Sequence, residues 1–376
     1  MKSLLLRLIT VSLVSMGVIS LNAQEENVEP DRGTAIFIED KMVKGYYPYS
    51  TMVTSVNPKA KPLFPVIDIH THFSLDTDPQ FIIKKMNELG LKRIVNLSGG
   101  WGDQLEQMLD KFHRPFPGKI DIFFNIDFSR IDEDDFGNKI AQDLKSAHAM
   151  GVSGIKLFKN FGLTRKDKSG KIIAIDDERL DPVWQMAGEL DIPILQHIGD
   201  PAAFFDPIDE KNERWLQLAR HPDWSFYGDE FPTRSELFAQ RDRLLSKHPS
   251  TTFIGAHIGS HADDLAAAAA VLEKHSNFYV ELSGRVAALG RQPYSARKFL
   301  NRYQDRVMFG TDRYPGRADQ PRYKVYYRFL ETDDEYFDYY DHPFPPTGEW
   351  KIYGVYLGED VLKKIYYQNA EKLLGN

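Results

Sequence analysis

The chain has 376 residues, no cysteine and a formal net charge of −7. This acidic balance argues against a surface for nucleic acid or for anionic membranes, because both are bound by clusters of Lys and Arg. A chain without cysteine forms no disulfides, so a large hydrophobic core has to stabilise it.

The first residues have the pattern of an export signal. Lys2 and Arg7 form a basic start, residues 4–21 are mainly apolar or small, and acidic residues follow Ala23. This order predicts a signal peptide over residues 1–23 that is removed on export. An uncleaved membrane anchor is the alternative, which the serines and Arg7 make the weaker one. We expect a periplasmic or secreted bacterial protein with no membrane attachment after cleavage, and the lack of cysteine excludes a bacterial lipid anchor.

Glycines and prolines punctuate residues 24–64, which we predict to be an N-terminal extension with one or two short strands. From Pro65 onward, short apolar runs alternate with amphipathic segments of helical length, the pattern of βαβ units around a parallel sheet. Eight runs are predicted as strands: 66–69, 93–97, 120–126, 154–158, 192–195, 252–256, 278–280 and 307–309. Eight such units predict an α/β fold, a closed (β/α)8 TIM barrel over residues 65–376. The dinucleotide and P-loop glycine motifs are both absent from the sequence.

Helix start signals lie between these strands. Asp78 and Asp181 each precede a proline, which predicts two N-caps. Thr233 and Glu236 have the spacing of a capping box, and Asp263-Asp264 brings negative charge to the start of another helix.

One stretch is too long for an ordinary barrel connection. Residues 314–358 are rich in Tyr, Pro and Asp. We predict that they form an insertion, a lid or side wall, ahead of a final helix at 359–374.

Polar side chains follow the predicted strands at their carboxyl ends, where a barrel has its active-site mouth. His70 and His72 are two residues apart on the first strand, so both imidazoles point to one face. Later strands end in further polar groups: Lys156, His197, His257, Glu281, Ser283 and Asp312. Isolated core histidines have no reason to recur at equivalent points of successive units. The pattern therefore predicts a site for a divalent metal ion at this end of the barrel.

Other polar residues have several interpretations. Lys156 is predicted to bind a substrate carboxylate, to pair with an acid such as Asp127, or to be carbamylated and bridge two metals. Arg285 is predicted to bind a substrate acid, with a surface salt bridge as the alternative. Asn125 and Trp101 are candidates for supporting or lining the pocket, as is Tyr314. The isolated histidines are predicted to be structural: His113, His148, His221, His248, His275 and His342.

The motifs at 66–73, 196–197, 255–259 and 309–312 resemble the amidohydrolase superfamily, in its amidohydrolase-related (amidohydrolase 2) branch of TIM-barrel metal-dependent hydrolases. The ending at 367–374 is similar to the closing helix of that branch. The resemblance implies that one divalent ion, most often zinc, is held by these four residues: His70, His72, His197 and Asp312. It also implies that His257 lies beside the metal as a catalytic base or carbonyl polariser. Lys156 is at about the position of a carbamylated lysine in binuclear branches, so a second metal stays open.

The predicted activity is hydrolysis of a carbonyl-centred bond, an amide, ester or lactone, in a small-molecule substrate. Asp312 would accept a proton from the attacking water and pass it to the leaving group. His257 would stabilise or protonate the oxygen that gains charge. A metal-dependent non-oxidative decarboxylase is the first alternative, and a catalytically inactive periplasmic binding protein is the second. The sequence leaves the oligomeric state open, including a homo-oligomer.

Overall fold

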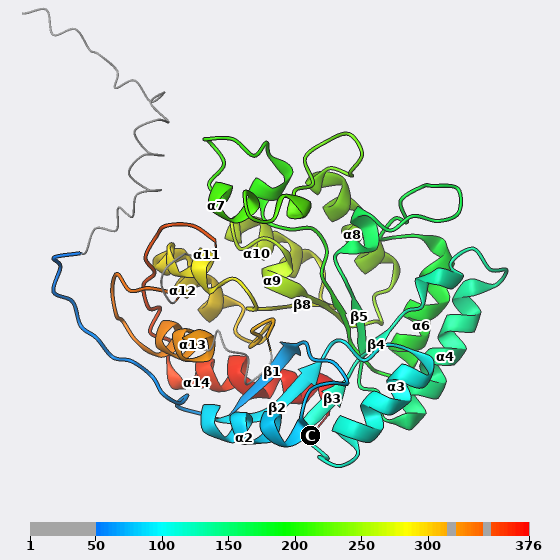
Figure 1. Ribbon diagram of the computed structural model, residues 1–376, viewed down its shortest axis with the longest axis horizontal. Helices are drawn as coiled ribbons and strands as arrows, with labels where there is room; N and C mark the ends of the chain where they lie inside the picture. Colours follow the sequence, from blue (N-terminus) through cyan, green and yellow to red (C-terminus); the bar gives the residue numbers. More distant parts are fainter. Residues whose placement is uncertain (1–49, 314–320, 341–346, 376) are drawn as a thin grey trace, which may run out of the picture. The chain divides into compact units, whose positions relative to one another are not determined.

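The computed structural model describes residues 50–313, 321–340 and 347–375 (Figure 1). The predicted signal peptide and most of the predicted N-terminal extension lie outside these residues. The chain divides into Met1–Thr51 and Met52–Asn376, and all that follows concerns the second unit. Residues 50–64 form neither helix nor strand, so the short strands predicted for the extension do not occur in this described part.

Parallel strands form a closed barrel. Along the chain, neighbouring strands pair in the orders β1-β2-β3 and β4-β5-β6-β7-β8-β9. The ring closes where the amide of Ile69 donates to the carbonyl of Phe309 at 3.2 Å and the amide of Asp312 donates to the carbonyl of His70 at 2.8 Å. The strands are β1 (Val66–Thr71), β2 (Leu91–Asn96), β3 (Ile120–Ile122), β4 (Phe124–Asn125), β5 (Ile155–Leu157), β6 (Ile194–Gln196), β7 (Phe253–Gly255), β8 (Phe278–Glu281) and β9 (Val307–Met308). The predicted (β/α)8 barrel is confirmed.

The third predicted strand differs in detail, because β3 and β4 are separate. β3 pairs with β2, and β4 pairs with β5. Between them Phe123 still donates its amide to Asn96, at 3.0 Å, while its ring packs where a side chain on Gly154 would overlap it. The strand changes partner at this residue, a local irregularity that alternation of apolar residues does not reveal.

Helices surround the strands (Figure 1). They are α2 (Pro79–Leu89), α3 (Gly102–Met108), α4 (Phe136–Met150), α5 (Asn160–Leu163), α6 (Asp181–Glu189), α7 (Trp215–Leu218), α8 (Arg234–Lys247), α9 (Ala256–Gly259), α10 (Leu265–Lys274), α11 (Val286–Gly290), α12 (Pro293–Arg302), α13 (Pro321–Glu331), α14 (Glu359–Lys363) and α15 (Asn369–Leu374). Short 3-10 turns lie at Phe128–Arg130, Glu178–Leu180, Ala202–Phe205 and Pro222–Trp224, and π turns at Leu109–His113 and Lys364–Gln368. Within the described ranges, none of these helices has the length and apolar character needed to cross a bilayer.

The predicted helix starts are mostly correct. Asp78 caps α2 by accepting from the amide of Gln80, and Thr233 forms the complete capping box of α8. Asp264 caps α10. The predicted N-cap at Asp181 is wrong. The 3-10 turn Glu178–Leu180 continues directly into α6, so Asp181 is the first residue of the helix and its side chain does not cap it. The carboxylate of Asp181 instead faces His248 Nε2 at 2.9 Å.

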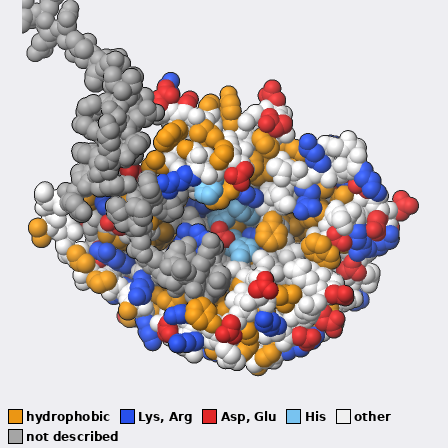
Figure 2. Space-filling view, in the orientation of Figure 1, with side chains coloured by type: hydrophobic (Ala, Val, Ile, Leu, Met, Phe, Trp, Pro, Cys, Tyr) orange, Lys and Arg blue, Asp and Glu red, His pale blue; other side chains and the backbone are white. Residues whose placement is uncertain are grey.

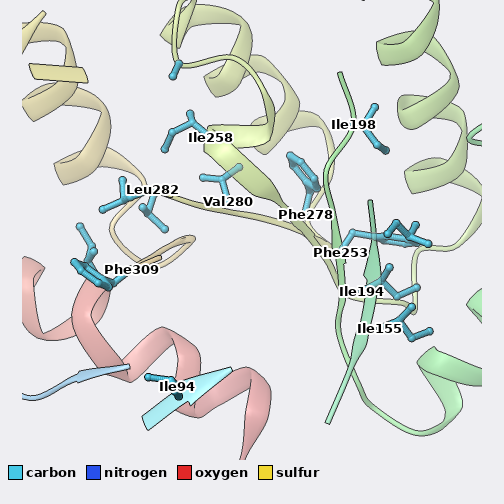
Figure 3. Packing of buried hydrophobic residues seen from close by; sticks show 14 of the residues in the cluster. Ile94, Ile155, Ile194, Ile198, Phe253, Ile258, Phe278, Val280, Leu282 and Phe309 are labelled. Carbon is cyan, nitrogen blue, oxygen red and sulfur yellow. The ribbon is translucent and has the colours of Figure 1, made fainter. Parts of the chain in front are cut away.

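Two layers of buried side chains hold the barrel together. Inside the ring, residues of the strands and of the positions next to their ends pack on one another: Ile67, Ile69, Val95, Leu97, Phe123, Leu195, Ile254, Ala256, Tyr279 and Met308. The alternate residues point outward into the layer between strands and helices, where Figure 3 shows Ile94, Ile155, Ile194, Phe253, Phe278, Val280 and Phe309. This alternation is the period-two pattern of strands covered on both faces.

The C-terminal part of the chain completes the barrel. In the predicted 314–358 insertion, residues 314–320 and 341–346 lie outside the described residues. α13 packs buried tyrosines against the barrel, and the hydroxyl of Tyr326 donates to the carbonyl of Leu282 at 3.1 Å. The predicted final helix is α14, a π turn and α15 in succession. Ala370 of α15 packs with the residues inside the ring, so the closing helix covers that interior layer.

Candidate metal centre

The two histidines of β1 are held through their Nδ1 atoms. Nδ1 of His70 lies 2.9 Å from Oε1 of Glu281, and Nδ1 of His72 lies 2.8 Å from Oγ of Ser98. A carboxylate accepts hydrogen bonds, so His70 carries its proton on Nδ1 and keeps a lone pair on Nε2. This arrangement, with a partner on the far nitrogen, is how metal-binding histidines are usually oriented.

Three electron-pair donors converge at the end of β1. Nε2 of His70 lies 3.2 Å from Nε2 of His72, and Oδ1 of Asp312 lies 3.4 Å and 3.5 Å from these two atoms. Around an ion with bonds of about 2.0–2.1 Å, neighbouring tetrahedral ligands are separated by about 3.3 Å. The three side chains therefore have a spacing that one small divalent cation could bridge.

These imidazoles are neutral near pH 7. Burial, followed by the nearby charge of Lys156, lowers the pKa of His72 to about 4 and that of His70 well below its ordinary value. A metal ion binds the neutral form of imidazole, because the proton and the ion compete for one lone pair. The site is therefore ready to accept a cation at neutral pH.

Lys156 lies against this cluster. Its Nζ is 3.3 Å from Nε2 of His70, and the residue is only 2% exposed. Burial lowers the pKa of Lys156 to about 8. The alternative in which Lys156 pairs with Asp127 is wrong, because the Asp127 carboxylate accepts from the amide and hydroxyl of Ser129 and caps a 3-10 turn.

His257 lies in an unusual left-handed turn after β7. Both His257 (φ 61°) and Ile258 (φ 60°) are in the left-handed region, followed by Gly259 and by Ser260 (φ 61°). This conformation is costly for residues with a side chain, and for β-branched Ile258 most of all. The turn places His257 so that its Nδ1 donates to the carbonyl of Ser283 at 2.7 Å. Burial also lowers the pKa of His257 well below 6.5, so the ring is neutral. Because its one proton is on Nδ1, Nε2 is unprotonated.

His197 stands beside this group rather than among the three converging donors. Its ring centroid is 4.3 Å from that of His257, and its Nε2 is 3.4 Å from Oδ1 of Asp200. Among the described residues, the donor atoms that approach within 4.8 Å of one another belong to two sets, His70-His72-Asp312 and His70-His257-Glu281. The structure thus brings His197 to the mouth of the barrel and gives it a carboxylate partner that the sequence did not predict.

The second set of donors is closed off by its own hydrogen bonds. Glu281 is wholly buried and accepts from the amide of His257 at 2.9 Å and from the hydroxyl of Ser283 at 2.7 Å, besides facing His70. Burial raises the pKa of Glu281 to about 7. Glu281 is therefore a support that orients two histidines. The sequence placed it at a strand end but gave no sign of this function.

Asp68 supports the same region from the other side. Burial raises its pKa to about 7, while it accepts from the hydroxyls of Thr311 and Tyr323 at 2.6 and 2.7 Å. These bonds fix the chain just before Asp312, whose backbone is left-handed (φ 59°) and whose side chain remains 40% exposed. The carboxylate of Asp312 is thus both close to the histidines and open to the solvent side.

A cavity of about 640 Å³ opens over the cluster. His72, His197, His257 and Asp312 line it together with Arg285, the predicted substrate-binding arginine. Figure 2 shows the histidines in a hollow near the middle of this face, with basic side chains around them. Its volume suits a small-molecule ligand.

Lys156 faces a second hollow. This smaller cavity of about 400 Å³ is lined by Trp101, Asn125 and Lys156 among others. The carboxamide of Asn125 accepts from the amide of Gly100 and donates to the carbonyl of Leu97, so it supports the backbone. Tyr314 lies outside the described residues.

Most histidines predicted to be structural have local partners. His221 lines the large cavity and stacks on Trp224 at 4.2 Å. His342 lies outside the described residues. The others contact nearby groups: His113 the carbonyl of Ile120, His148 that of Val152, His248 Asp181, and His275 Asp242.

Comparison with known proteins gives the family. The sequence model of the family described as "Amidohydrolase" matches residues 124–375, more than half of the chain. This match begins after β1, so His70 and His72 lie outside it. The search of curated proteins gave no match.

Several solved structures are similar to the chain. An amidohydrolase II structure has a TM-score of 0.52 at 14% identity and covers 83% of this chain and 100% of its own. An uncharacterized TIM-barrel protein from Bordetella bronchiseptica has a TM-score of 0.50 at 14% identity, with coverage of 83% and 98%. A 2,6-dihydroxybenzoate decarboxylase in complex with 2,6-dihydroxybenzoate has a TM-score of 0.49 at 15% identity, with coverage of 84% and 100%. The chain therefore belongs to the amidohydrolase family.

Proposed function

We propose that the protein is a metal-dependent hydrolase that cleaves an amide, ester or lactone bond in a small molecule. The observation that carries this proposal is the convergence of Nε2 of His70, Nε2 of His72 and Oδ1 of Asp312 within 3.5 Å of one another at the edge of an open cavity. A cation bound between the three donors would offset the repulsion among their lone pairs.

Zinc is the ion that we propose. The separations of 3.2–3.5 Å match the edges of a tetrahedral site with bonds of about 2.0–2.1 Å. His197 is the proposed fourth ligand, because it lines the same cavity as His72 and Asp312 and its ring centroid lies 4.3 Å from that of His257. A second ion would require carbamylation of Lys156. Carbamylation uses the neutral amine, and the lowered pKa of Lys156 increases the fraction of the side chain in that form.

The chemistry divides between the ion and the chain. When bound, a divalent ion polarises a carbonyl oxygen and makes water more acidic. Asp312 faces the open cavity, so its carboxylate can take a proton from water and return it to the leaving group. His257 is neutral, and its Nδ1–H donates a hydrogen bond to the carbonyl of Ser283. This favours a role for Nε2 as a base or hydrogen-bond acceptor over a role as an acid.

Decarboxylation is the second candidate. It is favoured by the basic side chains around the cavity, including Arg285, because a decarboxylase must bind a carboxylate. Hydrolysis is proposed first because the proton acceptor Asp312 is exposed to water.

One assay separates the candidates. Zinc-loaded protein is incubated with a panel of lactones, amides, esters and aromatic acids in ¹⁸O-water, and both labelled acid and carbon dioxide are measured. Hydrolysis predicts an acid product that contains ¹⁸O, with no release of carbon dioxide. Release of carbon dioxide together with an organic product that contains no ¹⁸O would establish the decarboxylase.

The Asp312→Asn variant tests the proposed proton acceptor. It should lower kcat/KM by a factor of about 10² or more, whereas Asp305→Asn, which changes a surface pair with Lys364, should leave kcat/KM unchanged. Full turnover by Asp312→Asn would overturn the proposed mechanism.

We further propose that the protein is exported to the periplasm or the cell exterior. The basic and apolar start of the sequence supports this. Mass spectrometry of the full-length product made in a bacterial host should find a mature chain that begins at Gln24, and an intact start at Met1 in the cytoplasm would contradict export.

A further inference from the structure

We propose that Arg214 and Arg285 together bind an acidic group of the substrate, a carboxylate or a phosphate, in the same cavity as the metal centre. The inference rests on the proposed function, in that this group is the end of the substrate that does not react. It goes beyond that function by naming the chemical class of the substrate, a small anion.

Arg214 is a buried arginine whose guanidinium lies 5.5 Å from the centre of the Trp350 ring and has few hydrogen-bond acceptors. It lines the cavity and is 3% exposed, and its Nε has no hydrogen-bond partner. Its Nη1 donates to the side chain of Gln217 at 3.3 Å. A guanidinium removed from water in this way is costly unless an anion or several acceptors surround it.

The nearest carboxylate to Arg214 is already used by another arginine. Glu213 receives two hydrogen bonds from Arg291, at 2.8 and 2.7 Å, while its distance to Nε of Arg214 is 3.8 Å. A fork of two short bonds is the strong geometry for an arginine–carboxylate pair, so Glu213 chiefly neutralises Arg291.

Arg285 is in a similar situation. Its Nη2 is 3.8 Å from Asp200, whose carboxylate is closer to Lys159, at 3.1 Å, and to His197, at 3.4 Å. Its Nη1 donates to the carbonyl of the adjacent Gly284. Arg285 therefore retains donors for a further acceptor in the cavity that it lines.

The two arginines influence each other electrostatically. Burial, followed by the positive charge of Arg285, lowers the pKa of Arg214 to about 10. The two guanidinium groups therefore bring two like charges to one cavity. An anion bound by both arginines would offset this repulsion. Among the described acids that line the cavity, Asp200 comes within 4 Å of Arg285, and neither Asp200 nor Asp312 forms an ion pair with Arg214.

The rest of the cavity wall has the same sign. Among the described residues that line it, the acids are Asp200 and Asp312, and the cationic side chains are Lys159, Arg214, Arg220, Arg285, Arg313 and Arg322. The whole chain carries a net charge of −7, so this concentration of positive charge is local. Such a cavity attracts small anions and rejects neutral analogues of the same shape.

The test measures binding to metal-free, full-length protein. Glutarate and inorganic phosphate are titrated by calorimetry in a low-chloride buffer, with glutaramide as the neutral analogue, against the wild type and the variants Arg214→Gln, Arg285→Gln and Arg214→Lys. Arg302→Gln is the matched control, because this arginine is exposed and pairs with Glu273 outside the cavity. Using metal-free protein separates this test from that of the proposed function.

We expect glutarate or phosphate, but not glutaramide, to bind the wild type and Arg302→Gln. Each Gln variant should weaken that binding about thirtyfold or more, and Arg214→Lys should restore part of it. The preferred probe tells a carboxylate site from a phosphate site. The Arg214→Gln variant should melt at an unchanged or higher temperature, because it removes a buried charge. Equal binding by all variants, or binding of glutaramide as tight as that of glutarate, would overturn the inference.

Discussion

Glu281 holds two of the histidines at the candidate metal centre without facing the cavity itself. It lies 2.9 Å from Nδ1 of His70 and accepts from the amide of His257 at the same distance. The sequence marked His70 and His257 because imidazoles at strand ends are conspicuous. A single buried glutamate at the end of a strand carries no comparable signal.

Replacing Glu281 tests this support. Glu281→Gln keeps the size of the side chain but turns one accepting oxygen into a donor. Because partners of this kind orient metal ligands, we expect metal affinity to fall about 10–100-fold. Competition with a chelator measures the affinity, and Glu273→Gln on the exposed side of α10 is the control. Unchanged affinity would show that His70 is oriented without Glu281.

Lys156 should lower the stability of the metal-free protein. Its folded-state pKa of about 8 is below the ordinary 10.5, so the cost of burying its charge is fully present below pH 8 and is relieved as the pH rises toward 10.5. Lys156→Met should therefore raise the free energy of unfolding at pH 7 by about 1–3 kcal/mol.

Urea denaturation of the metal-free wild type and variant measures this difference. It should shrink between pH 8 and pH 10, because the wild type gains stability over that range. If Lys156→Met is less stable than the wild type at pH 7, the contacts of the Lys156 ammonium offset the cost of burying its charge. A loss of activity in the more stable variant would identify Lys156 as a functional residue.

At the level of elements, regular patterns were predictable and irregular ones were not. The capping box at Thr233 depends on residues three apart in the sequence and was predicted correctly. The left-handed turn at His257 and the change of partner at Phe123 depend on contacts with distant strands. The sequence around Phe123 contains no turn signal, and Gly259-Ser260 does not announce that His257 and Ile258 before it are left-handed.

The closing helix offers a test at this scale. Asn369 of α15 donates from Nδ2 to the carbonyls of Gln304 and Val307, both at 2.7 Å, and is 5% exposed. Asn369→Ala leaves two carbonyls unpaired and should destabilise the fold by about 1–3 kcal/mol. The melting temperature should fall, while kcat of the folded enzyme should not change.

Asn301 on α12 is the matched control. Its half-buried side chain donates to the single carbonyl of Arg297, so Asn301→Ala should cost less than Asn369→Ala. An equal decrease in the free energy of unfolding of both variants would show that the hydrogen bonds of Asn369 to the barrel contribute no more than the local bond of Asn301.

At the level of the whole molecule, the barrel and the location of its site followed from the sequence. Eight apolar runs with polar ends predict strands whose ends meet at one mouth, and His70, His72 and Asp312 do meet there. Asp200 and Arg214 were not predicted, because they lie in long connections after a strand. Only the folded chain shows that these connections return to the cavity. The substrate class therefore depends on tertiary structure more than the metal chemistry does.

The central claim is that one divalent ion is bound by His70, His72 and Asp312. The most direct measurement is a crystal structure of the zinc-loaded protein with anomalous data on both sides of the zinc absorption edge. We predict one strong peak at about 2.0–2.2 Å from Nε2 of both histidines and from Oδ1 of Asp312, absent from His72→Ala. No peak at this position, or one between His70, His257 and Glu281, would contradict the proposed centre.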